Sequence, residues 1–248
     1  MKENEMIFGV RAVIEALQAG KEVDKILIKR DFQGDLTRTL FAIARQANIP
    51  VQRVPQEKLD RLTRKNHQGV IAFLPAVDYQ RLEDIVPHLY ETGKTPFIVL
   101  LDGITDVRNF GAIARTCACA GVDAIVIPSH NSVTVTADAI KTSAGALLTL
   151  PVCKERSITD AIRFLKDCGL TLIAASERAP VDYTSVNFTP PTALVMGAED
   201  MGVATDNLHL CHHVVKIPLA GAIASLNVSA ATAVLAFEVV RQRRMAST

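Results

Sequence analysis

The sequence predicts an α/β protein in which a mainly parallel sheet is covered by helices on both faces and is preceded by a smaller α/β unit. Segments with helical periodicity alternate with extended segments along the chain. Two extended segments, FIVLL at 97–101 and AIVI at 124–127, are continuously apolar, which is typical of parallel strands buried on both faces. Hydrophobic residues make up 49% of the 248 positions, which is enough for a substantial core.

Residues 1–75 are predicted to form a small domain of short elements. The patterns predict helices over residues 8–17, 35–47 and 56–63 and strands over residues 25–29, 51–54 and 69–74. Asp35 is suited to cap the second helix, because its carboxylate can accept hydrogen bonds from free backbone amides. Prolines at 75, 87 and 96 enclose a stretch with only a brief helical pattern, so we expect a linker over residues 76–95.

The second predicted domain, residues 96–248, continues the alternation. Strands are expected over residues 97–101, 124–127, 170–174, 193–196 and 214–217, and helices over residues 109–120 and 225–243. Asn109 is the expected N-cap of the first of these helices. The last helix has two apolar faces, formed by Leu226, Ala230, Ala233 and Phe237 and by Val228, Leu235 and Val239. One face can pack on the sheet, and the other predicts contact with a second subunit.

Composition limits the classes of partner. The net charge is +1, but residues 1–75 carry 13 Lys and Arg against 9 Asp and Glu, an excess of four positive charges. Such an excess is compatible with a nucleic acid partner and is also common on solvated helix faces. Aromatic residues make up 5% of the chain and Trp is absent, which argues against binding bases on rows of aromatic side chains.

The cysteines and histidines indicate no disulfide and no metal site. The five cysteines include no C-x-x-C pair, which is typical of reduced, buried thiols in a cytoplasmic protein. His209, His212 and His213 beside Cys211 match no standard zinc spacing, and we expect them to be solvent-facing residues at a strand edge. No apolar run reaches the length of a membrane span, and charges in the first residues argue against a signal peptide.

Three polar, glycine-containing segments follow apolar strands, where open α/β sheets bind ligands: residues 101–121, 194–203 and 217–233. None follows a familiar nucleotide-binding pattern. The chain has no G-x-G-x-x-G after a strand, and the spacing of Gly197 and Gly202 is not followed by the Lys-Ser/Thr of a P-loop. A nucleophile elbow, G-x-S-x-G, is also absent. A dinucleotide-dependent small-molecule enzyme is therefore disfavoured.

Within these segments, NFGAIAR at 109–115, LVMGAE at 194–199 and IPLAGAIASLNVSAATA at 217–233 resemble motifs 1, 2 and 3 of the SpoU (TrmH) methyltransferases. Their order and separation make the resemblance specific. It extends to EMIFGVRAV near the start, HQG at 67–69 and FEVVRQR near the end, and so covers nearly the whole chain. Within the family, the chain is most similar to the bacterial large-subunit (23S) rRNA guanosine-2′-O-methyltransferases.

The resemblance implies a SPOUT fold, in which the C-terminal part of a parallel sheet is threaded into a trefoil knot, an exception to ordinary chain connections. It implies S-adenosylmethionine as cofactor, a homodimer formed through the knotted domain, and an RNA-binding role for residues 1–75. The implied activity is methylation of a ribose 2′-hydroxyl, in large-subunit rRNA. Two alternatives stay open: the same chemistry on tRNA, and a dimer that binds RNA without methylating it.

The resemblance also implies roles for single residues. Backbone groups of Gly197, Ile217 and Leu226 would hold the cofactor, and the side chains of Met196 and Leu219 would line the pocket beside it. Ile217 and Leu226 could instead be ordinary core residues. The implied catalytic residues are Asn109, Arg115, Glu199, Ser225 and Asn227. Asn109, Ser225 and Asn227 could equally be helix caps. A guanidinium stays protonated, so Arg115 is better suited to stabilise an alkoxide or hold a phosphate than to act as a base, and it could also be a plain surface residue.

Two further expectations concern the substrate. Asp200 follows Glu199 where the family often has glycine, which alters either the turn or the charge beside the site. For RNA contact, the candidate residues of the first domain are Lys29, Arg30, Arg53, Arg61, Arg64, Lys65, His67 and Gln68. Each of these could also be a solvated surface residue.

Overall fold

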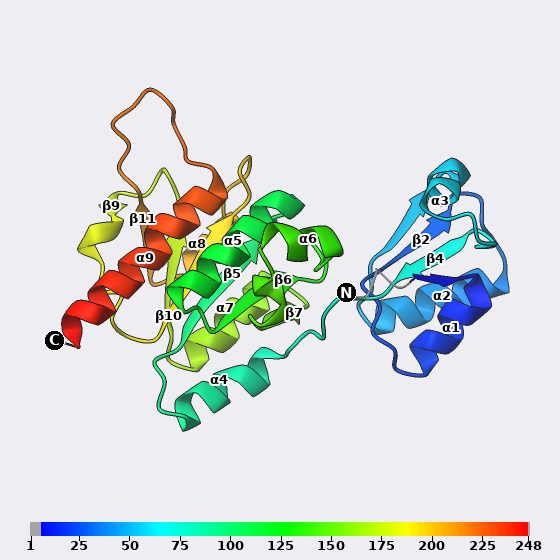
Figure 1. Ribbon diagram of the computed structural model, residues 1–248, viewed down its shortest axis with the longest axis horizontal. Helices are drawn as coiled ribbons and strands as arrows, with labels where there is room; N and C mark the ends of the chain where they lie inside the picture. The colour runs from blue at the N-terminus through cyan, green and yellow to red at the C-terminus, as the bar shows by residue number, and fades with distance from the viewer. Residues whose placement is uncertain (1–5, 248) are drawn as a thin grey trace. The chain divides into compact units, whose positions relative to one another are not determined.

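The computed structural model describes residues 6–247, which form two compact units (Figure 1). Within the described residues, the first unit comprises residues 6–78 together with Thr134–Ala137, and the second comprises Tyr79–Val133 and residues 138–247. Residues 1–5, where the predicted first domain begins, lie outside the described residues. No helix in the described part of the chain is long and apolar enough to cross a membrane.

The first unit is a four-stranded sheet of order β1-β4-β2-β3. Its elements are β1 (Met6–Phe8), α1 (Val10–Gln18), β2 (Lys25–Lys29), α2 (Asp35–Gln46), β3 (Val51–Val54), α3 (Gln56–Leu62) and β4 (Val70–Phe73). Helices α1 and α2 bury Val13 and Leu40 against Ile26 on one face of the sheet. On the other face, Leu59 of α3 packs on Leu27.

The start of this unit differs from the prediction, because residues 6–8 form a strand and the helix predicted from residue 8 begins only at Val10. Met6–Phe8 pairs with β4 in antiparallel register. Gly9 then turns the chain with a φ of 86°, and its amide donates to the Val70 carbonyl at 3.0 Å. Only glycine adopts this φ at little cost, so α1 begins after it, at Val10.

The predicted linker is also corrected. Residues 82–91 form a full helix, α4 (Leu82–Glu91), that belongs to the second unit. Leu82, Val86 and Leu89 are buried in the core of that unit beside Ile98 and Leu100. Their spacing of three and four residues places them on one helix face, which explains why this proline-containing stretch is folded.

The second unit is a seven-stranded sheet of order β7-β6-β5-β10-β8-β11-β9, and each of its strand pairs is parallel. After α4, its elements are β5 (Phe97–Asp102), α5 (Val107–Ala120), β6 (Ala124–Pro128), α6 (Ala137–Thr142), β7 (Val152–Glu155), α7 (Ile158–Asp167), β8 (Thr171–Ala175), β9 (Val181–Asp182), β10 (Thr192–Gly197), α8 (Thr205–Leu210), β11 (His213–Lys216) and α9 (Val228–Ala246), with 3-10 turns at Ala146–Leu148 and Tyr183–Ser185. The predicted α/β class with a parallel sheet is confirmed.

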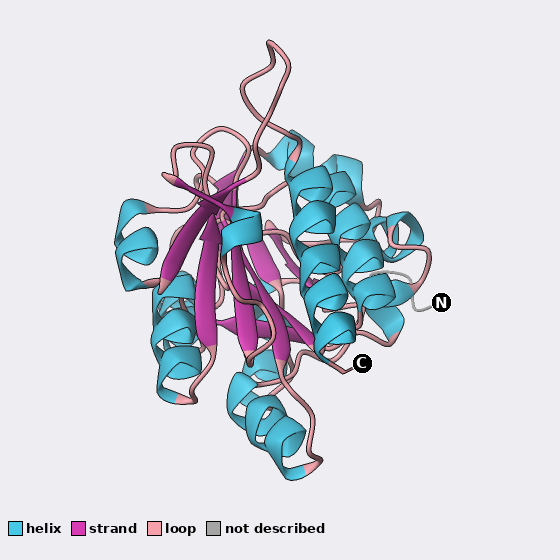
Figure 2. Ribbon diagram, turned by 90° about the vertical axis from the view of Figure 1, so that its left-hand side faces the viewer, coloured by secondary structure: helices cyan, strands magenta, loops and turns pink. Residues whose placement is uncertain are grey.

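Helices cover both faces of this sheet (Figure 2). Helices α4 and α7 pack on one face, where the alternate residues Ile98 and Leu100 of β5 point. Helix α9 packs against α5 and β10 on the other face. There Arg243 lies over the ring of Phe97 at 5.5 Å and donates to the carbonyls of Thr95, Pro96 and Pro190. This guanidinium fixes the last turns of α9 against the segments that lead into β5 and β10.

Candidate active site

A cavity of about 330 Å³ lies at the carboxyl ends of β8, β10 and β11. Its lining includes the five residues predicted to hold a cofactor, together with two of the predicted catalytic residues: Met196, Gly197, Ile217, Leu219, Leu226, Glu199 and Ser225. This is the edge at which open α/β sheets bind ligands, and the volume is suited to a small cofactor. The structure therefore brings motifs 2 and 3 together around one pocket.

The floor of the pocket depends on Gly197. A Cβ at this position would overlap the backbone of Gly202 and Val203, because the loop after β10 folds back on the end of its own strand. The Gly202 amide donates to the Ala198 carbonyl at 2.8 Å, and the Ala198 amide donates to the Asp102 carbonyl at 3.0 Å. The absence of a side chain at Gly197 therefore makes room for the protein's own backbone.

Residues after β11 form an apolar wall on a long loop, residues 217–227, which extends away from the sheet in Figure 1. Leu219 and Leu226 are 40% and 39% exposed, and Ile217 is half-buried. The alternative interpretation of Ile217 and Leu226 as ordinary core residues is therefore wrong. These side chains line the cavity and leave apolar surface for a ligand to cover.

Sequence reasoning missed one part of the lining. Residues 175–178, which follow β8, contribute Ser176, Glu177 and Arg178 to the pocket. Their signal was present in the sequence, because a polar run directly after a buried parallel strand lies at the ligand-binding edge of the sheet.

Beside the pocket, Asn109, Glu199 and Asn227 form one hydrogen-bonded cluster. The Asn109 side-chain amide donates to Glu199 Oε1 at 3.1 Å. The side-chain amide of Asn227 donates one hydrogen bond to Asn109 Oδ1 at 3.0 Å and another to Glu199 Oε1. Both donors meet the same carboxylate oxygen, and among the described residues no donor pairs with Oε2. One residue of each motif thus meets the others, and an exposed carboxylate oxygen is left to accept a bond from a ligand.

Two of these residues are positioned by helix caps. The N-cap of α5 is Asp106, whose Oδ1 accepts a hydrogen bond from the backbone amide of Asn109 at 2.8 Å. The prediction that Asn109 is the cap is therefore wrong. Asn227 does cap α9, because its Oδ1 accepts the Ser229 amide at 2.9 Å. Ser225 lies two residues before that cap, exposed on the loop. The side-chain amides of Asn109 and Asn227 are therefore held at the start of two helices and remain directed at Glu199.

Arg115 lies apart from the cluster. It is exposed on α5, outside the pocket lining, and it makes no hydrogen bond or ion pair with any residue between 6 and 247. It follows Asn109 by six positions, so it points about 240° around the helix axis from that side chain. Within one chain, neither Asn109 nor Glu199 is hydrogen-bonded to Arg115.

A second network fixes the loop that carries Glu199. Asp102, at the end of β5, accepts the Ala204 amide and the Asn207 side-chain amide through Oδ2, both at 2.9 Å. Asn207 is only 4% exposed, and its Oδ1 accepts the Thr159 hydroxyl at 2.7 Å. Because a buried amide is costly unless it is bonded, this network sets the position of α8 and of the loop before it.

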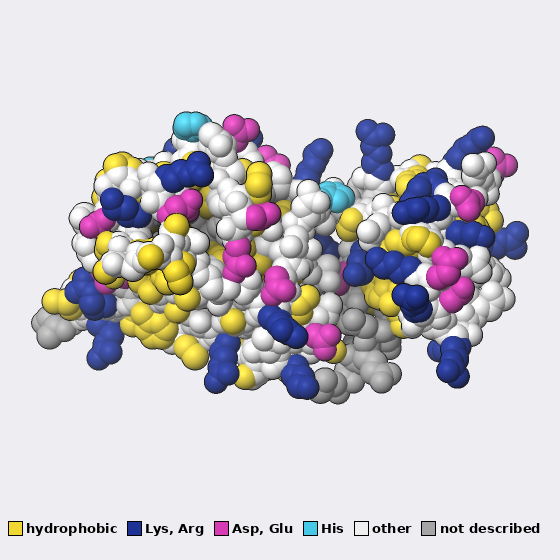
Figure 3. All heavy atoms as spheres, turned by 90° about the horizontal axis from the view of Figure 1, so that it is seen from above, with side chains coloured by type: hydrophobic (Ala, Val, Ile, Leu, Met, Phe, Trp, Pro, Cys, Tyr) yellow, Lys and Arg dark blue, Asp and Glu magenta, His cyan; other side chains and the backbone are white. Residues whose placement is uncertain are grey.

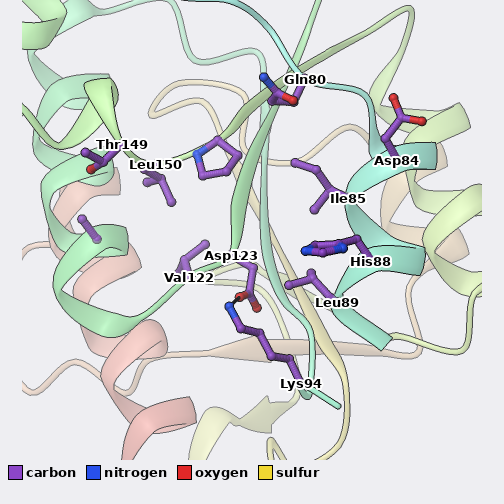
Figure 4. A pocket seen from close by; sticks show the side chains of 12 residues that line it. Gln80, Asp84, Ile85, His88, Leu89, Lys94, Val122, Asp123, Thr149 and Leu150 are labelled. Atoms are coloured by element: carbon purple, nitrogen blue, oxygen red, sulfur yellow. Dashed lines mark ion pairs between the residues drawn. The ribbon is translucent and has the colours of Figure 1, made fainter. Parts of the chain in front are cut away.

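A second cavity of the unit, about 530 Å³, lies elsewhere (Figure 4). It is lined by residues of α4 and by segments that precede β5, β6 and β7, including His88, Lys94, Asp123 and Thr149. Lys94 already pairs with Asp123 at 3.8 Å. Burial raises the pKa of Asp123, while the Phe97 amide and Lys94 oppose that shift. This cavity is at the amino ends of the strands, so we assign the ligand site to the pocket at their carboxyl ends.

In the first unit, one predicted RNA contact is corrected. His67 is 7% exposed, its Nε2 bonds to Asp60 at 2.8 Å, and its Nδ1 accepts the Gly69 amide at 3.1 Å. It therefore holds the turn before β4 and does not face a ligand. The other predicted contacts are accessible: Lys29 is half-buried, and Arg30, Arg64, Lys65 and Gln68 are exposed. Arg53 donates to the Arg30 carbonyl at 2.6 Å, which orders the turn after β2.

No group of three or more His, Cys, Asp or Glu side chains in the described chain could hold a metal ion. Cys211 is half-buried, its thiol donates to the Asn207 carbonyl at 3.2 Å, and burial raises its pKa to about 12. His209, His212 and His213 are exposed, as expected, but they do not lie at a strand edge, because His209 belongs to α8 and β11 lies between β8 and β9.

Comparison with known proteins gives two family matches. The pattern of the SpoU rRNA Methylase family matches residues 96–237, and that of the RNA 2′-O ribose methyltransferase substrate-binding domain matches residues 6–80. A Bacillus subtilis protein, YacO, which is named for the TrmH family of tRNA/rRNA methyltransferases, is 31% identical over 242 residues, covering 98% of this chain and 97% of that protein. A Staphylococcus aureus protein named for the same family is 33% identical over 241 residues, which are 97% of each chain.

Two solved structures are similar over nearly the whole chain. The SpoU methyltransferase AviRb from Streptomyces viridochromogenes, in complex with AdoMet, has 25% identity and a TM-score of 0.61, covering 98% of this chain and 92% of its own. An AdoMet-bound rRNA methyltransferase from Sinorhizobium meliloti has 26% identity and a TM-score of 0.60, covering 95% and 86%.

Proposed function

The chain belongs to the SpoU rRNA methylase family, and on this basis we propose that it transfers a methyl group from S-adenosylmethionine to a ribose 2′-hydroxyl of large-subunit rRNA. The observation that carries the proposal is the cluster of Asn109, Glu199 and Asn227 at the edge of the pocket. Three segments far apart in the sequence supply these side chains, and the pocket beside them is lined by motifs 2 and 3.

The pocket fits the cofactor in its chemistry. Met196, Ile217 and Leu226 offer an apolar slot for an adenine ring, and the loop backbone around Gly197 offers peptide groups for hydrogen bonds. Glu177, Glu199 and Asp200 place carboxylates around a ligand that carries a positive sulfonium. When bound, S-adenosylmethionine supplies an electrophilic methyl group.

The chain's own residues would bind and orient the ribose. Glu199 Oε2 accepts a hydrogen bond from the 2′-hydroxyl and is placed to take its proton, while Asn109 and Asn227 hold the carboxylate in place through Oε1. Arg115 stabilises the negative charge that develops on the attacking oxygen, or binds a neighbouring phosphate. Ser225 contacts the substrate from the loop before α9. Positioning and charge stabilisation supply most of the rate in this scheme, because a sulfonium needs little help to leave.

We further propose that the second unit forms a homodimer and contains the trefoil knot implied by the family. In α9, Val228, Leu235 and Val239 are buried within the unit, whereas Ala230 and Phe237 of the other apolar face are exposed, Phe237 by 48%. A second copy would cover this face. Since Arg115 does not reach the pocket of its own chain, a dimer would also allow it to serve the partner's site.

The substrate is tested by methyl transfer from labelled S-adenosylmethionine to protein-free large-subunit rRNA, small-subunit rRNA and tRNA in parallel. The proposal predicts label in large-subunit rRNA, on a guanosine. Label confined to tRNA would overturn the substrate and keep the chemistry. Absence of label on every RNA, from protein shown to bind the cofactor, would favour a role in RNA binding alone.

A further inference from the structure

We propose that the α3 side of the first unit's sheet stacks unpaired bases of the RNA, with Phe8 and Phe73 as the stacking side chains and Lys25 and Lys65 as phosphate-binding neighbours. This inference rests on the proposed function, because it names how that RNA is held. We call the surface formed by these four residues the aromatic platform.

The strand register places both rings on one face. Phe8 of β1 lies opposite Ile71 of β4, and Phe73 lies two residues further along β4, so the two rings are diagonal neighbours. Lys25 of β2 lies opposite Phe73 on its other side. Side chains alternate along a strand, so these residues share the face of Leu27 and Ile71 and not that of α1 and α2.

Helix α3 covers only part of this face. Its Leu59 is fully buried against Leu27, Val54 and Ile71, which lie on the central and far strands. Phe8 and Phe73, at the β1 edge, stay partly exposed beside that cluster. A half-covered pair of aromatic rings on a sheet is the arrangement on which single-stranded RNA domains stack two or three bases.

Charge complementarity favours RNA as the occupant. The Lys65 ammonium lies 5.4 Å from the centre of the Phe8 ring, and the Lys25 ammonium lies 4.9 Å from that of Phe73. From Met6 to Asp78 the chain has 12 Lys and Arg against 8 Asp and Glu. Figure 3, which looks onto the side of this unit that carries α3, shows basic side chains around apolar atoms. A base can take the place of each ammonium over its ring, while the lysine stem swings to a phosphate.

Stacking on a sheet face requires bases that are not already stacked in a duplex, so the platform should select unpaired nucleotides. Phe41 provides a matched control within the same unit. It packs against the α1 and α2 side of the core, and its ring has the Arg53 guanidinium at 5.3 Å. It is therefore the same kind of aromatic–cation pair outside the platform.

The test measures binding of the full-length protein to a labelled single-stranded RNA and to the matching duplex, by fluorescence anisotropy at one salt concentration. Phe8→Leu and Phe73→Leu should each weaken single-strand binding roughly 10-fold and leave duplex binding nearly unchanged. Phe41→Leu should leave both unchanged, and Phe8→Tyr, which keeps the ring, should bind like the wild type. Melting temperatures close to that of the wild type confirm that the variants fold.

Equal affinities of the Phe8→Leu, Phe73→Leu and Phe41→Leu variants for the single strand would overturn the platform, and so would equal losses on duplex and single strand. The proposed function is judged separately, by methyl transfer. A wild type that transfers no methyl group refutes the enzyme while the binding series still decides the platform. Conversely, an unchanged KM for rRNA in the Phe73→Leu variant refutes the platform and leaves the enzyme intact.

Discussion

The side-chain amide of Asn227 donates a hydrogen bond to Asn109 Oδ1 at 3.0 Å, although 118 positions separate the two residues in sequence. Each residue sits in the first turn or at the cap of a helix, α5 or α9, and these two helices pack against each other. Their bond therefore ties the geometry of the Glu199 carboxylate to the packing of the fold.

Replacing Glu199 by Gln should lower methyl transfer and leave the fold intact. The substitution removes the charge and turns one acceptor into a donor beside two donating amides. Hydrogen bonds to charged groups contribute about 1.5–3 kcal/mol, so we expect a loss of roughly 10- to 150-fold in kcat/KM. Asp206→Asn, which changes an exposed carboxylate on α8 outside the pocket lining, serves as the control in the same steady-state assay. Equal activity of the Glu199→Gln variant and the wild type would remove Glu199 from the site.

Gly197→Ala should abolish cofactor binding and destabilise the second unit. Its Cβ would overlap the backbone of Gly202 and Val203, and a backbone cannot move aside as a flexible side chain can. Gly221→Ala is the matched control, because its Cβ would meet no atom within 4 Å. Equilibrium binding of labelled S-adenosylmethionine and the melting temperature report the two effects. If the Gly197→Ala variant bound S-adenosylmethionine and melted like the Gly221→Ala variant, the backbone of Gly202 and Val203 would not pack against Gly197 as it does in this structure.

Asn207→Leu should destabilise the second unit by about 2 kcal/mol, because the Thr159 hydroxyl loses its acceptor and the Asp102 carboxylate keeps only the Ala204 amide of its two donors. Asn207 is buried, whereas His209→Leu on the same helix changes an exposed position and should have little effect. Urea denaturation monitored by circular dichroism measures both. A midpoint for Asn207→Leu at or above that of His209→Leu would contradict the role of this network.

Stability should fall below about pH 6.5 in part through His212. Its Nδ1 accepts the Leu172 amide at 2.9 Å, which requires the neutral ring, and burial, helped by Lys166 and His213, lowers its pKa in the folded protein. As pH drops, His212 therefore takes up a proton in the unfolded chain before it does so in the folded protein. The stabilisation that neutral His212 contributes is complete above its pKa in the unfolded chain and is lost as pH falls through its pKa in the folded protein. In His212→Asn the side-chain oxygen can still accept the amide but does not titrate. Its melting temperature should drop less between pH 7.5 and 5.5 than that of the wild type, and an equal drop would exclude His212 as a contributor.

Strong local patterns made much of the fold predictable. The strands Lys25–Lys29 and Val51–Val54 have the predicted bounds, because apolar residues and turn residues delimit them clearly. The SPOUT-type α/β fold with a preceding substrate-binding domain, implied by the three motifs, is confirmed. The strand Met6–Phe8 was missed because three residues carry no period of their own and form a strand only through pairing with β4. Helix α7 does carry a signal, a Ser157 cap before apolar positions, that the alternation alone left unassigned.

The residues of the candidate site that belong to the three motifs could be predicted from the sequence. The directions in which their side chains point could not be read from the motifs. The resemblance alone brings Asn109, Glu199 and Asn227 to one place. The angular separation of Asn109 and Arg115 follows from helix geometry and was available from their spacing. Phe8 and Phe73 could not be found, since the composition argued against stacking surfaces and only the pairing of two distant strands brings the rings together.

In the proposed reaction the methyl group goes to a ribose oxygen, and the product nucleoside tests this most directly. Large-subunit rRNA would be treated with the protein and S-adenosylmethionine carrying a deuterated methyl group, then digested to nucleosides and fragmented by mass spectrometry, with Arg115→Ala run in parallel. We predict the label on the ribose fragment of a guanosine, and much less of it with Arg115→Ala. Label on a base fragment would contradict the account.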